Sequence, residues 1–529
     1  MRYKPHIIIC KKQVFVDFKG QILYTKAEDK KRSEEEAMFE RVSPEAVGIS
    51  SRYVEKFIST LEKRKARMHS VLLLRGDKLF GEYYWAPFNK DTCHRMYSQT
   101  KSYVSIAIGF LLDEGKLSLD DRIADFFPEK IRVENEQIRR QTVRNMLMMS
   151  TVGHGKSWFE RENTDRLDLY FNREGITRSP DTIWEYDSQG SQVLCTLVEK
   201  LSGMCLFDYL KKKLFDHLGT FKTASILKTP TGESWGDSAL LCTSRDMLSF
   251  ARFVMNYGTW NGKRLLSEGY LREATSKLID NQEDAHGGPL SHGYGYQIWC
   301  TEENGFAFIG MGDELTICLP DYDLIFVCTA DNQGNPRSRA LIMDSLFDII
   351  VANLGKAPLD EDKDAQNSLE ELSSSLKLFA VTGAEDSPYR EKIDGVKYTF
   401  EENELGLKNL TVSFEGKGEG KLTYENSNGK MELPFYINKN RFEKFPELGY
   451  SQDVGGVRTH DGSKYDCAVS AAWLNPNRLM IFVQIIDRYL GNFPMTLGFS
   501  DEFISVTAYK NAEDFLWNYN GHAYGKREK

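Results

Sequence analysis

The pattern of apolar and polar positions first indicates two β-strands, over 69–74 and 78–84, where β-branched and aromatic residues are frequent. Between them stands Arg75-Gly76-Asp77, which favours a tight turn, so the two runs are expected to form a hairpin. An amphipathic helix over about 51–64 is expected before them. The apolar spacing of 98–115, which ends at Gly115, predicts a buried helix closed by a glycine.

Helices and loops are expected to dominate from about 120 to 290, and short apolar runs then return at 306–309, 315–319 and 324–329. A helix over about 337–354 follows them. Two strands and a helix therefore open this region, and three strands and a helix close it. We expect one antiparallel sheet built from both ends of the segment, flanked by helices and interrupted by an all-helical insert, which is an α/β (α+β) fold.

The composition then divides the chain. Residues 1–40 form a polar extension, 41–355 the α/β domain, and 356–374 a charged stretch that indicates a linker. Residues 375–529 alternate short apolar runs with Gly, Asn and Asp turns, which predicts an accessory all-β domain. A short helix near 511–518 is expected to close it.

Charge and cysteine usage exclude several classes of protein. Acidic residues outnumber Lys and Arg by 77 to 68, which argues against a nucleic-acid partner. No stretch approaches the roughly 18 apolar residues of a membrane span. The nine cysteines lie in no metal-binding pattern and several stand within apolar runs, so we expect a cytoplasmic protein without metal or cofactor. The oligomeric state stays open, with a homo-oligomer among the alternatives.

The candidate chemistry lies at Ser98-Gln99-Thr100-Lys101, at the start of the predicted buried helix. A spacing of three residues places the Ser98 hydroxyl and the Lys101 amine on one helix face. Serine is a poor nucleophile until a base takes its proton, and a lysine can act as that base. The free amide groups of a helix N-terminus also stabilise a developing oxyanion.

The longer segment from Met96 onward, MYSQTKSYVSIAIGFLLDEGKLSLDDRIADFFPE, resembles the active-site region of the serine β-lactamase and penicillin-binding-protein superfamily. Its class C-like branch of esterases, amidases and D-peptidases is the best match. WEYDSQG at 184–190 and LLCTSRDMLSFARFVMNYGTWNGKRLLS at 240–267 resemble later segments, so the similarity spans about 40–355. The resemblance implies a β-lactamase/transpeptidase-like fold, with Ser98 as the acylated nucleophile, Lys101 as its proton acceptor and Tyr186 as a second general base or acid.

The resemblance also implies substrate contacts at Ser188 and on a strand that usually carries Lys-Thr-Gly or His-x-Gly. The matching residues here are Phe308-Ile309-Gly310, followed by Met311. Gly310 still lets the backbone approach a substrate, and the amides of Met311 and Ser98 would form the oxyanion hole. No Lys, His or Thr side chain is present to bind a substrate carboxylate, which favours esters or amides over β-lactams and peptidoglycan.

The sequence therefore predicts a serine hydrolase of the esterase, amidase or peptidase type, acting on a small or peptide-like substrate through an acyl-enzyme. Two alternatives stay open. An acyltransferase would differ only in the second nucleophile, and a non-catalytic receptor for β-lactams or peptides would share the fold. His94, His154, His286 and His292 are further candidate bases, each more typical of a structural residue.

Overall fold

The computed structural model describes residues 38–153, 165–173, 175–176, 178–281, 288–451, 453–455 and 463–528. The chain divides into two compact units, Met1–Arg41 and Val42–Lys529. Of the first unit only residues 38–41 are described, and they include the short strand β1 (Glu40–Arg41). The second unit contains an α/β domain and a β-barrel.

The α/β domain contains an antiparallel sheet whose strands follow the order β3-β2-β12-β11-β10-β9. Their bounds are β2 (Met68–Arg75), β3 (Lys78–Tyr84), β9 (Trp299–Cys300), β10 (Phe306–Ile309), β11 (Leu315–Leu319) and β12 (Leu324–Ala330). The predicted hairpin is β2 and β3. Strand β12 pairs with β2 along its whole length, with Phe326 opposite Leu73, which confirms that both ends of the segment build one sheet.

One face of the sheet is covered by helices from the two ends of the domain. They are α2 (Ser51–Lys63), α12 (Ser338–Ser345), the π-helical η8 (Leu346–Ile350), the 3₁₀ helix η9 (Val351–Asn353) and α13 (Lys363–Ser375). Phe57 of α2 meets Phe326 of β12 edge to face, with ring centroids 5.9 Å apart. Buried aliphatic and aromatic side chains of these helices and strands form one continuous core.

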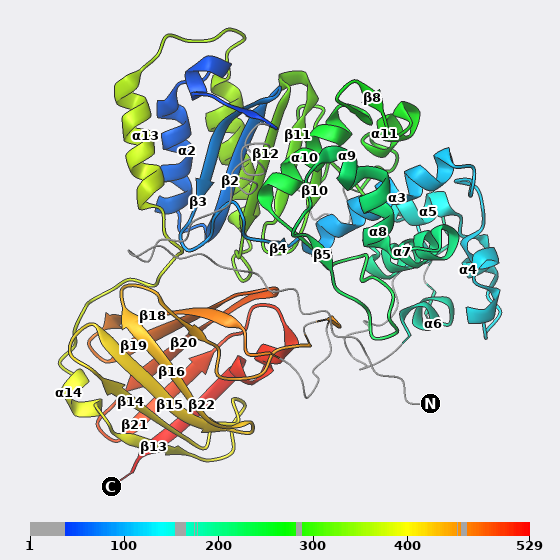
Figure 1. Ribbon diagram of the computed structural model, residues 1–529. Coiled ribbons are helices and arrows are strands. Elements are labelled where there is room, and N and C mark those ends of the chain that lie inside the picture. The colour runs from blue at the N-terminus through cyan, green and yellow to red at the C-terminus, as the bar shows by residue number, and fades with distance from the viewer. Residues whose placement is uncertain are drawn as a thin grey trace, which may run out of the picture. The chain divides into compact units, whose positions relative to one another are not determined.

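The stretch predicted as a linker, 356–374, instead contains most of helix α13, which lies beside α2 (Figure 1). Asp362 caps this helix by accepting a hydrogen bond of 3.0 Å from the Ala365 amide. The linker interpretation was wrong because it followed charge content alone. Leu369 lies on the helix face that turns inward, Leu376 directly follows the helix, and both are buried in the core.

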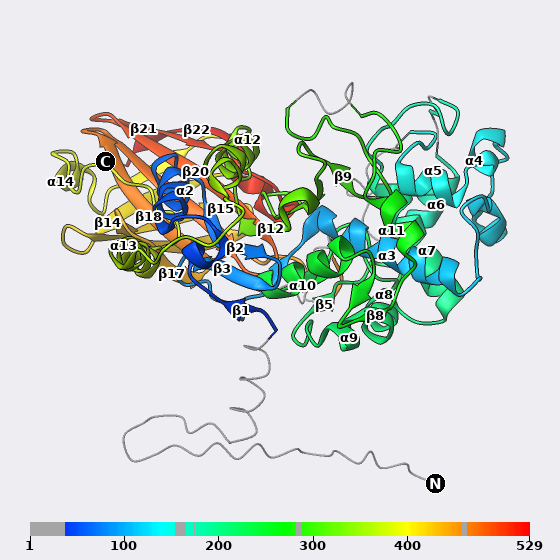
Figure 2. The ribbon, with the colours of Figure 1, turned by 90° about the horizontal axis from the view of Figure 1, so that it is seen from above.

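The opposite face of the sheet carries α10 and the helical insert, the latter well away from β2 and β3 (Figure 2). The helices are α3 (Thr100–Asp113), α4 (Glu136–Arg140), α5 (Val143–Met148), α6 (Arg166–Phe171), α7 (Ser188–Ser202), α8 (Leu206–Leu210), η6 (Lys211–Phe215), α9 (Asp216–Leu218), α10 (Ser244–Met255) and α11 (Glu268–Ala274). Every residue of α3 from Thr100 to Leu111 is buried, so the helix is enclosed on all sides. Tyr103 of α3 stacks on Phe250 of α10 at 3.8 Å, which fixes α3 against the helix that covers the sheet.

Short elements connect these layers. They are η1 (Pro44–Val47), β4 (His94–Arg95), η2 (Tyr97–Gln99), η3 (Ile123–Phe126), η4 (Pro128–Lys130), β5 (Ser225–Ile226), β6 (Leu240–Cys242), β7 (Thr259–Trp260), β8 (Lys263–Arg264) and η7 (Pro320–Tyr322). Strand β6 pairs with β4 and β5 in a small separate sheet. This is the β-lactamase/transpeptidase-like arrangement that the resemblance implies.

The C-terminal domain is the predicted all-β domain, and its strands close into a barrel. Its elements are α14 (Arg390–Ile393), β13 (Lys397–Phe400), β14 (Asn409–Phe414), β15 (Glu419–Asn426), β16 (Gly429–Ile437), β17 (Arg441–Lys444), β18 (Asp466–Asn475), β19 (Arg478–Ile486), β20 (Leu490–Phe499), β21 (Phe503–Ala508), η10 (Asp514–Tyr519) and β22 (Gly521–Arg527). The sheet runs β16-β15-β14-β13-β22-β21-β20-β19-β18, and a parallel pairing of β16 with β18 closes this nine-stranded ring. The predicted closing helix corresponds to η10, but strand β22 follows it and joins β13 to β21.

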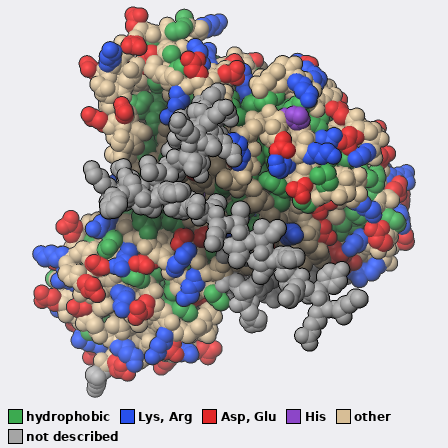
Figure 3. All heavy atoms as spheres, viewed as in Figure 1, with side chains coloured by type: hydrophobic (Ala, Val, Ile, Leu, Met, Phe, Trp, Pro, Cys, Tyr) green, Lys and Arg blue, Asp and Glu red, His purple; other side chains and the backbone are tan. Residues whose placement is uncertain are grey.

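Charged side chains of both signs are mixed over the face of the molecule in Figure 3, without a broad basic patch among the atoms described there. Among the helices of the described residues, none is both long and apolar enough to cross a membrane.

Candidate active site

Ser98 and Lys101 lie where strand β4 passes through η2 into helix α3. Ser98 is partly exposed, whereas Lys101 is only 1% exposed. The amine of Lys101 donates a hydrogen bond of 2.9 Å to the Ser98 hydroxyl oxygen. It donates a second, of 2.7 Å, to the backbone carbonyl of Asp237. The predicted pair is therefore in direct contact, and the carbonyl holds the flexible lysine side chain in one place.

Tyr186 lies next to this pair. The Lys101 nitrogen stands 5.0 Å from the centroid of the Tyr186 ring. The ring stacks on Trp299, with centroids 5.7 Å apart and planes at 20°. Its hydroxyl makes no hydrogen bond to another described residue. The structure thus brings the predicted tyrosine to the lysine, with the ring face toward the amine.

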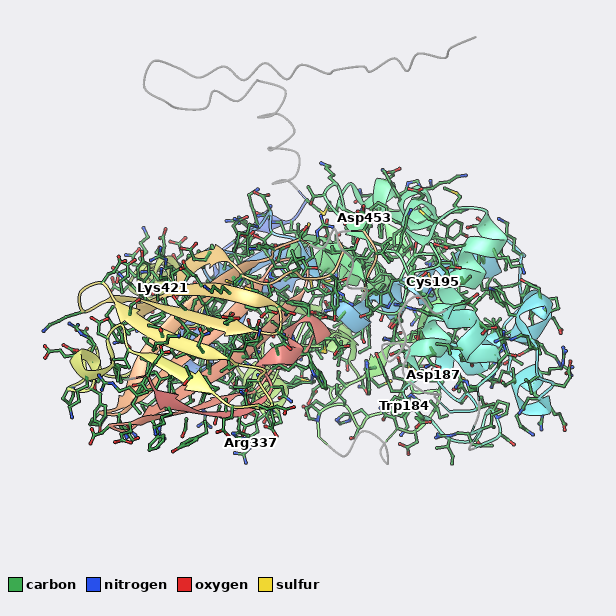
Figure 4. All side chains as sticks on the ribbon, turned by 90° about the horizontal axis from the view of Figure 1, so that it is seen from below. Trp184, Asp187, Cys195, Arg337, Lys421 and Asp453 are labelled. Carbon is green, nitrogen blue, oxygen red and sulfur yellow. The ribbon has the colours of Figure 1, made fainter. Side chains whose placement is uncertain are left out.

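The loop that carries Tyr186 is fixed by the start of helix α7. Asp187 caps this helix by accepting a 2.9 Å hydrogen bond from the Gly190 amide, and its other carboxylate oxygen accepts one of 2.8 Å from the Thr151 hydroxyl. Figure 4 shows Trp184 and Asp187 beside each other at one end of α7, with Cys195 further along. Ser188, the predicted substrate contact, is the first residue of α7 and is partly exposed.

The predicted oxyanion residues lie at the end of strand β10, which packs against η2. A Cβ added to Gly310 would stand 2.3 Å from the carbonyl oxygen of Met96, so only glycine permits this approach. The Gly310 amide donates to the Glu314 carbonyl at 2.8 Å, which closes the turn. Met311, within this turn, is 40% exposed. Its amide makes no backbone hydrogen bond within the described ranges, as an oxyanion donor requires.

The two side chains before Gly310 both face apolar cores. Phe308 is buried and its ring lies 5.2 Å from that of Phe250 in α10. Ile309 belongs to the core formed by α2 and the sheet. Strand β10 therefore supplies neither a cation nor a hydroxyl at the positions where the resemblance leads one to expect them.

Buried charges surround the lysine. Burial raises the pKa of the Asp237 carboxyl, while Lys101, Arg166 and Arg95 act in the opposite direction. Arg166 lies 3.9 Å from the Asp237 carboxylate, and burial lowers the pKa of Arg166 to about 10. Beside the oxyanion turn, burial raises the pKa of Glu314 well above its ordinary value.

The other candidate bases lie apart from this chemistry. The ring of His94 is buried, with its Nε2 3.1 Å from Nδ1 of His69, and His292 is exposed. His154 and His286 lie outside the described residues. Asp237 is a site residue that the sequence does not single out, because it acts through its backbone carbonyl. Across the described parts of the chain, no three His, Cys, Asp or Glu side chains are grouped so as to hold a metal.

Comparisons with known proteins identify the family of the chain. The family model described as Beta-lactamase matches residues 54–346, more than half of the chain. A 6-aminohexanoate-dimer hydrolase from Paenarthrobacter ureafaciens is 25% identical over 259 residues, covering 46% of this chain and 66% of the relative. Penicillin-binding protein 4 from Amycolatopsis lactamdurans is 28% identical over 248 residues, covering 40% and 64%. The chain thus spans slightly less than two thirds of the length of each of these curated relatives.

Among solved structures, the octameric penicillin-binding protein homologue from Pyrococcus abyssi is 15% identical, with a TM-score of 0.47. That alignment covers 90% of this chain and 99% of the homologue. The family match includes Ser98, Lys101 and Tyr186 as well as the strand that ends at Gly310. The chain belongs to the beta-lactamase family of serine hydrolases and carries a C-terminal β-barrel domain.

Proposed function

We propose that this serine hydrolase cleaves an ester or amide through an acyl-enzyme on Ser98. The observation that carries the proposal is the 2.9 Å contact between the Lys101 amine and the Ser98 hydroxyl, inside a site where the lysine is buried. Once neutral, an amine at this distance can take the hydroxyl proton as the oxygen attacks a carbonyl carbon. The amides of Ser98 and Met311 would receive the oxyanion.

The steps after the first attack release the products and return the enzyme to its starting state. Collapse of the tetrahedral intermediate breaks the C–O or C–N bond, and the leaving group takes up the proton. Water then attacks the acyl-enzyme and loses its proton to the same bases. Collapse of this second tetrahedral intermediate breaks the bond between the acyl carbon and the Ser98 oxygen, which takes the proton back as the acid product leaves. We assign Tyr186 to this proton transfer with Lys101, the role that the family resemblance implies, and its ring lies beside the lysine, 5.0 Å from the nitrogen. An acyltransferase would replace that water by an alcohol or amine.

Because strand β10 is apolar, we favour a substrate that has no carboxylate beside the scissile bond. Phe308 and Ile309 are committed to the cores, so the strand offers no partner for such a charge. The 6-aminohexanoate-dimer hydrolase, a hydrolase by its name, is a relative that suits this class. We therefore favour simple esters and amides over β-lactams. Rapid turnover of a chromogenic cephalosporin by the purified protein would contradict that preference.

Labelling with a fluorophosphonate tests the nucleophile. We expect the intact protein to be labelled on Ser98 and to hydrolyse p-nitrophenyl esters. Ser98→Ala should abolish labelling and lower kcat/KM by about a thousandfold or more. Lys101→Met should slow labelling by about a hundredfold or more, because the hydroxyl loses its base. The matched control is Ser105→Ala in the same helix, whose hydroxyl contacts Tyr270.

The outcomes separate the competing functions. Labelling that persists in Ser98→Ala would place the nucleophile elsewhere. An intact protein that is neither labelled nor active on esters and amides would favour the non-catalytic receptor. Faster product release on addition of a small alcohol, with formation of the new ester, would favour an acyltransferase.

A further inference from the structure

The residue before the candidate nucleophile has an unusual backbone. Tyr97 has φ = 45°, in the left-handed region that residues other than glycine rarely occupy. Its side chain is buried. A conformation of this kind persists only where the surrounding structure holds it, and it is found preferentially at functional sites. The orientation of Ser98 therefore depends on whatever holds Tyr97.

The hydrogen-bond partners of the Tyr97 hydroxyl, Leu490 and Glu513, belong to the barrel. It accepts a 3.0 Å hydrogen bond from the amide of Leu490, the first residue of β20. It also lies 3.0 Å from the Leu490 carbonyl and 3.0 Å from Oε1 of Glu513, the residue that precedes η10. Its single proton can serve either acceptor. The segment that presents Ser98 is thus anchored through a side chain whose partners belong to the other domain.

Glu513 is also connected to the residues that hold Lys101, through an ion pair with Arg95. The Arg95 guanidinium is buried and lies 3.4 Å from Glu513. It donates to the Ser238 carbonyl at 2.8 Å and to the Ser238 hydroxyl at 3.1 Å. The neighbouring carbonyl, that of Asp237, is the acceptor that holds Lys101. One barrel carboxyl is therefore connected to the supports of both Ser98 and Lys101.

Aromatic rings enclose this ion pair. The Arg95 guanidinium lies 4.4 Å from the ring centroid of Tyr97, 4.4 Å from that of Trp235 and 4.6 Å from that of Tyr489. We call Arg95, Tyr97, Trp235, Tyr489 and Glu513 the Arg95 cluster. An ion pair enclosed in this way is shielded from water and salt, so its geometry is more sharply defined than that of a surface pair.

The barrel also supports the oxyanion side. Asn492 of β20 donates to the Asp331 carboxylate at 2.8 Å, and Gln333 donates to the Leu490 carbonyl at 3.0 Å. Asn332 lies between Asp331 and Gln333 in the sequence, and its amide donates a hydrogen bond of 3.0 Å to the Gly312 carbonyl. Gly312 follows Met311 in the turn after β10. The start of β20 is thus linked to the nucleophile segment and to the oxyanion turn.

We propose that the barrel is a positioning domain for the active site, and that Glu513 and Tyr97 are the positioning residues through which it sets the reactive orientation of Ser98. The inference rests on the proposed function, since it concerns the rate at which Ser98 is acylated. Neither residue is assigned a contact with substrate. Their loss is expected to lower kcat more than to raise KM.

The experiment compares Tyr97→Phe and Glu513→Gln with Tyr424→Phe in the full chain. Tyr424→Phe removes a buried barrel hydroxyl that pairs with Tyr519 at 2.5 Å and lies outside the Arg95 cluster. Each protein is assayed for fluorophosphonate labelling rate, for kcat and KM on a p-nitrophenyl ester, and for thermal unfolding. We expect labelling and kcat to fall about ten- to a hundredfold in the two cluster variants and to remain within about twofold of wild type in the control.

Each outcome is decisive. If all three variants lose thermal stability but label at the wild-type rate, the contacts only hold the domains together and the proposal is overturned. If only one of the two cluster variants folds, its kcat is compared with that of Tyr424→Phe. A lower kcat supports the proposal, and an equal kcat overturns it. Glu513→Asp, which restores the charge with a shorter side chain, is expected to recover part of the rate lost in Glu513→Gln. A wild-type protein that is not labelled overturns the proposed function, and this inference with it.

Discussion

At the scale of single residues, Gly310 shows how closely the two halves of the candidate site approach each other. The Met96 carbonyl oxygen and the Glu314 Cβ would lie 2.3 Å and 2.9 Å from a Cβ at this position. Because the first of these neighbours is backbone, it cannot rotate away. The clash would have to be relieved by moving β10 from η2, and with it the Met311 amide from Ser98.

We therefore expect Gly310→Ala to lower kcat/KM on a p-nitrophenyl ester by about a hundredfold, the size typical of a misplaced oxyanion donor. Gly418→Ala is the matched control, because nothing lies within 4 Å of a Cβ added there. Circular dichroism should show both variants folded. Wild-type activity in Gly310→Ala would contradict the assignment of the Met311 amide to the oxyanion hole.

The same scale shows which site residues a sequence can reveal. Ser98 and Lys101 are recognisable because a three-residue spacing on a helix brings their side chains together, and they are 2.9 Å apart. Asp237 is not recognisable, because any residue has a carbonyl and the fold alone places this one at Lys101. Arg95 and Glu513 are 418 residues apart and belong to different domains, so no local pattern joins them.

At the scale of elements, local patterns located five strands of the large sheet, β2, β3, β10, β11 and β12, and the helices α2, α3 and α12. The runs predicted at 306–309 and 315–319 have the same bounds as β10 and β11. Two features could not be predicted, because they depend on partners distant in sequence. One is the parallel pairing of β16 with β18 that closes the barrel. The other is helix α13, whose few apolar residues are buried because they pack against α2.

Helix α13 offers a test of that packing. Leu369 is 6% exposed and lies in the core shared with α2. We expect Leu369→Ala to lower the free energy of unfolding by about 2–4 kcal/mol, through lost burial and the cavity it leaves. Ser374→Ala, at an exposed position of the same helix, should change it by less than about 0.5 kcal/mol. Denaturant titrations measure both. Equal midpoints for wild type and Leu369→Ala would show that α13 contributes no packing energy.

At the scale of the whole molecule, two buried histidines lie near the junction of the α/β domain and the barrel. His69 stacks on Phe88 at 4.0 Å, and His69 Nδ1 lies 3.1 Å from His94 Nε2. Phe88 in turn packs in a small core with Ala468 of β18 and with Leu378, before the barrel. A charge on either imidazole would therefore be introduced into an apolar layer beside the contact between the domains.

This arrangement predicts that acid weakens the fold. Burial lowers the pKa of His94 from its ordinary 6.5 to about 4. Burial, His94 and Arg67 together lower that of His69 well below 6.5. Between pH 6.5 and about 4 the unfolded chain binds protons that the folded chain does not. The stabilisation is complete above pH 6.5 and is lost as the pH falls, by about 3 kcal/mol for His94 alone near pH 4.

Denaturant midpoints at pH 7.5, 6.5, 5.5 and 4.5 test this expectation, with His94→Gln to separate the histidine from carboxylates that also titrate in acid. The variant should start less stable at pH 7.5, because the contact to His69 changes, and should lose less stability on acidification. His292→Gln is the control, since His292 is exposed and its replacement should leave the wild-type pH dependence intact. If His94→Gln and wild type lose stability in parallel, the buried pair does not govern the acid response. Because the same junction holds the barrel against Arg95 and Tyr97, any hydrolysis of the p-nitrophenyl ester is expected to fall with the population of folded protein over that pH range, and to fall less in His94→Gln.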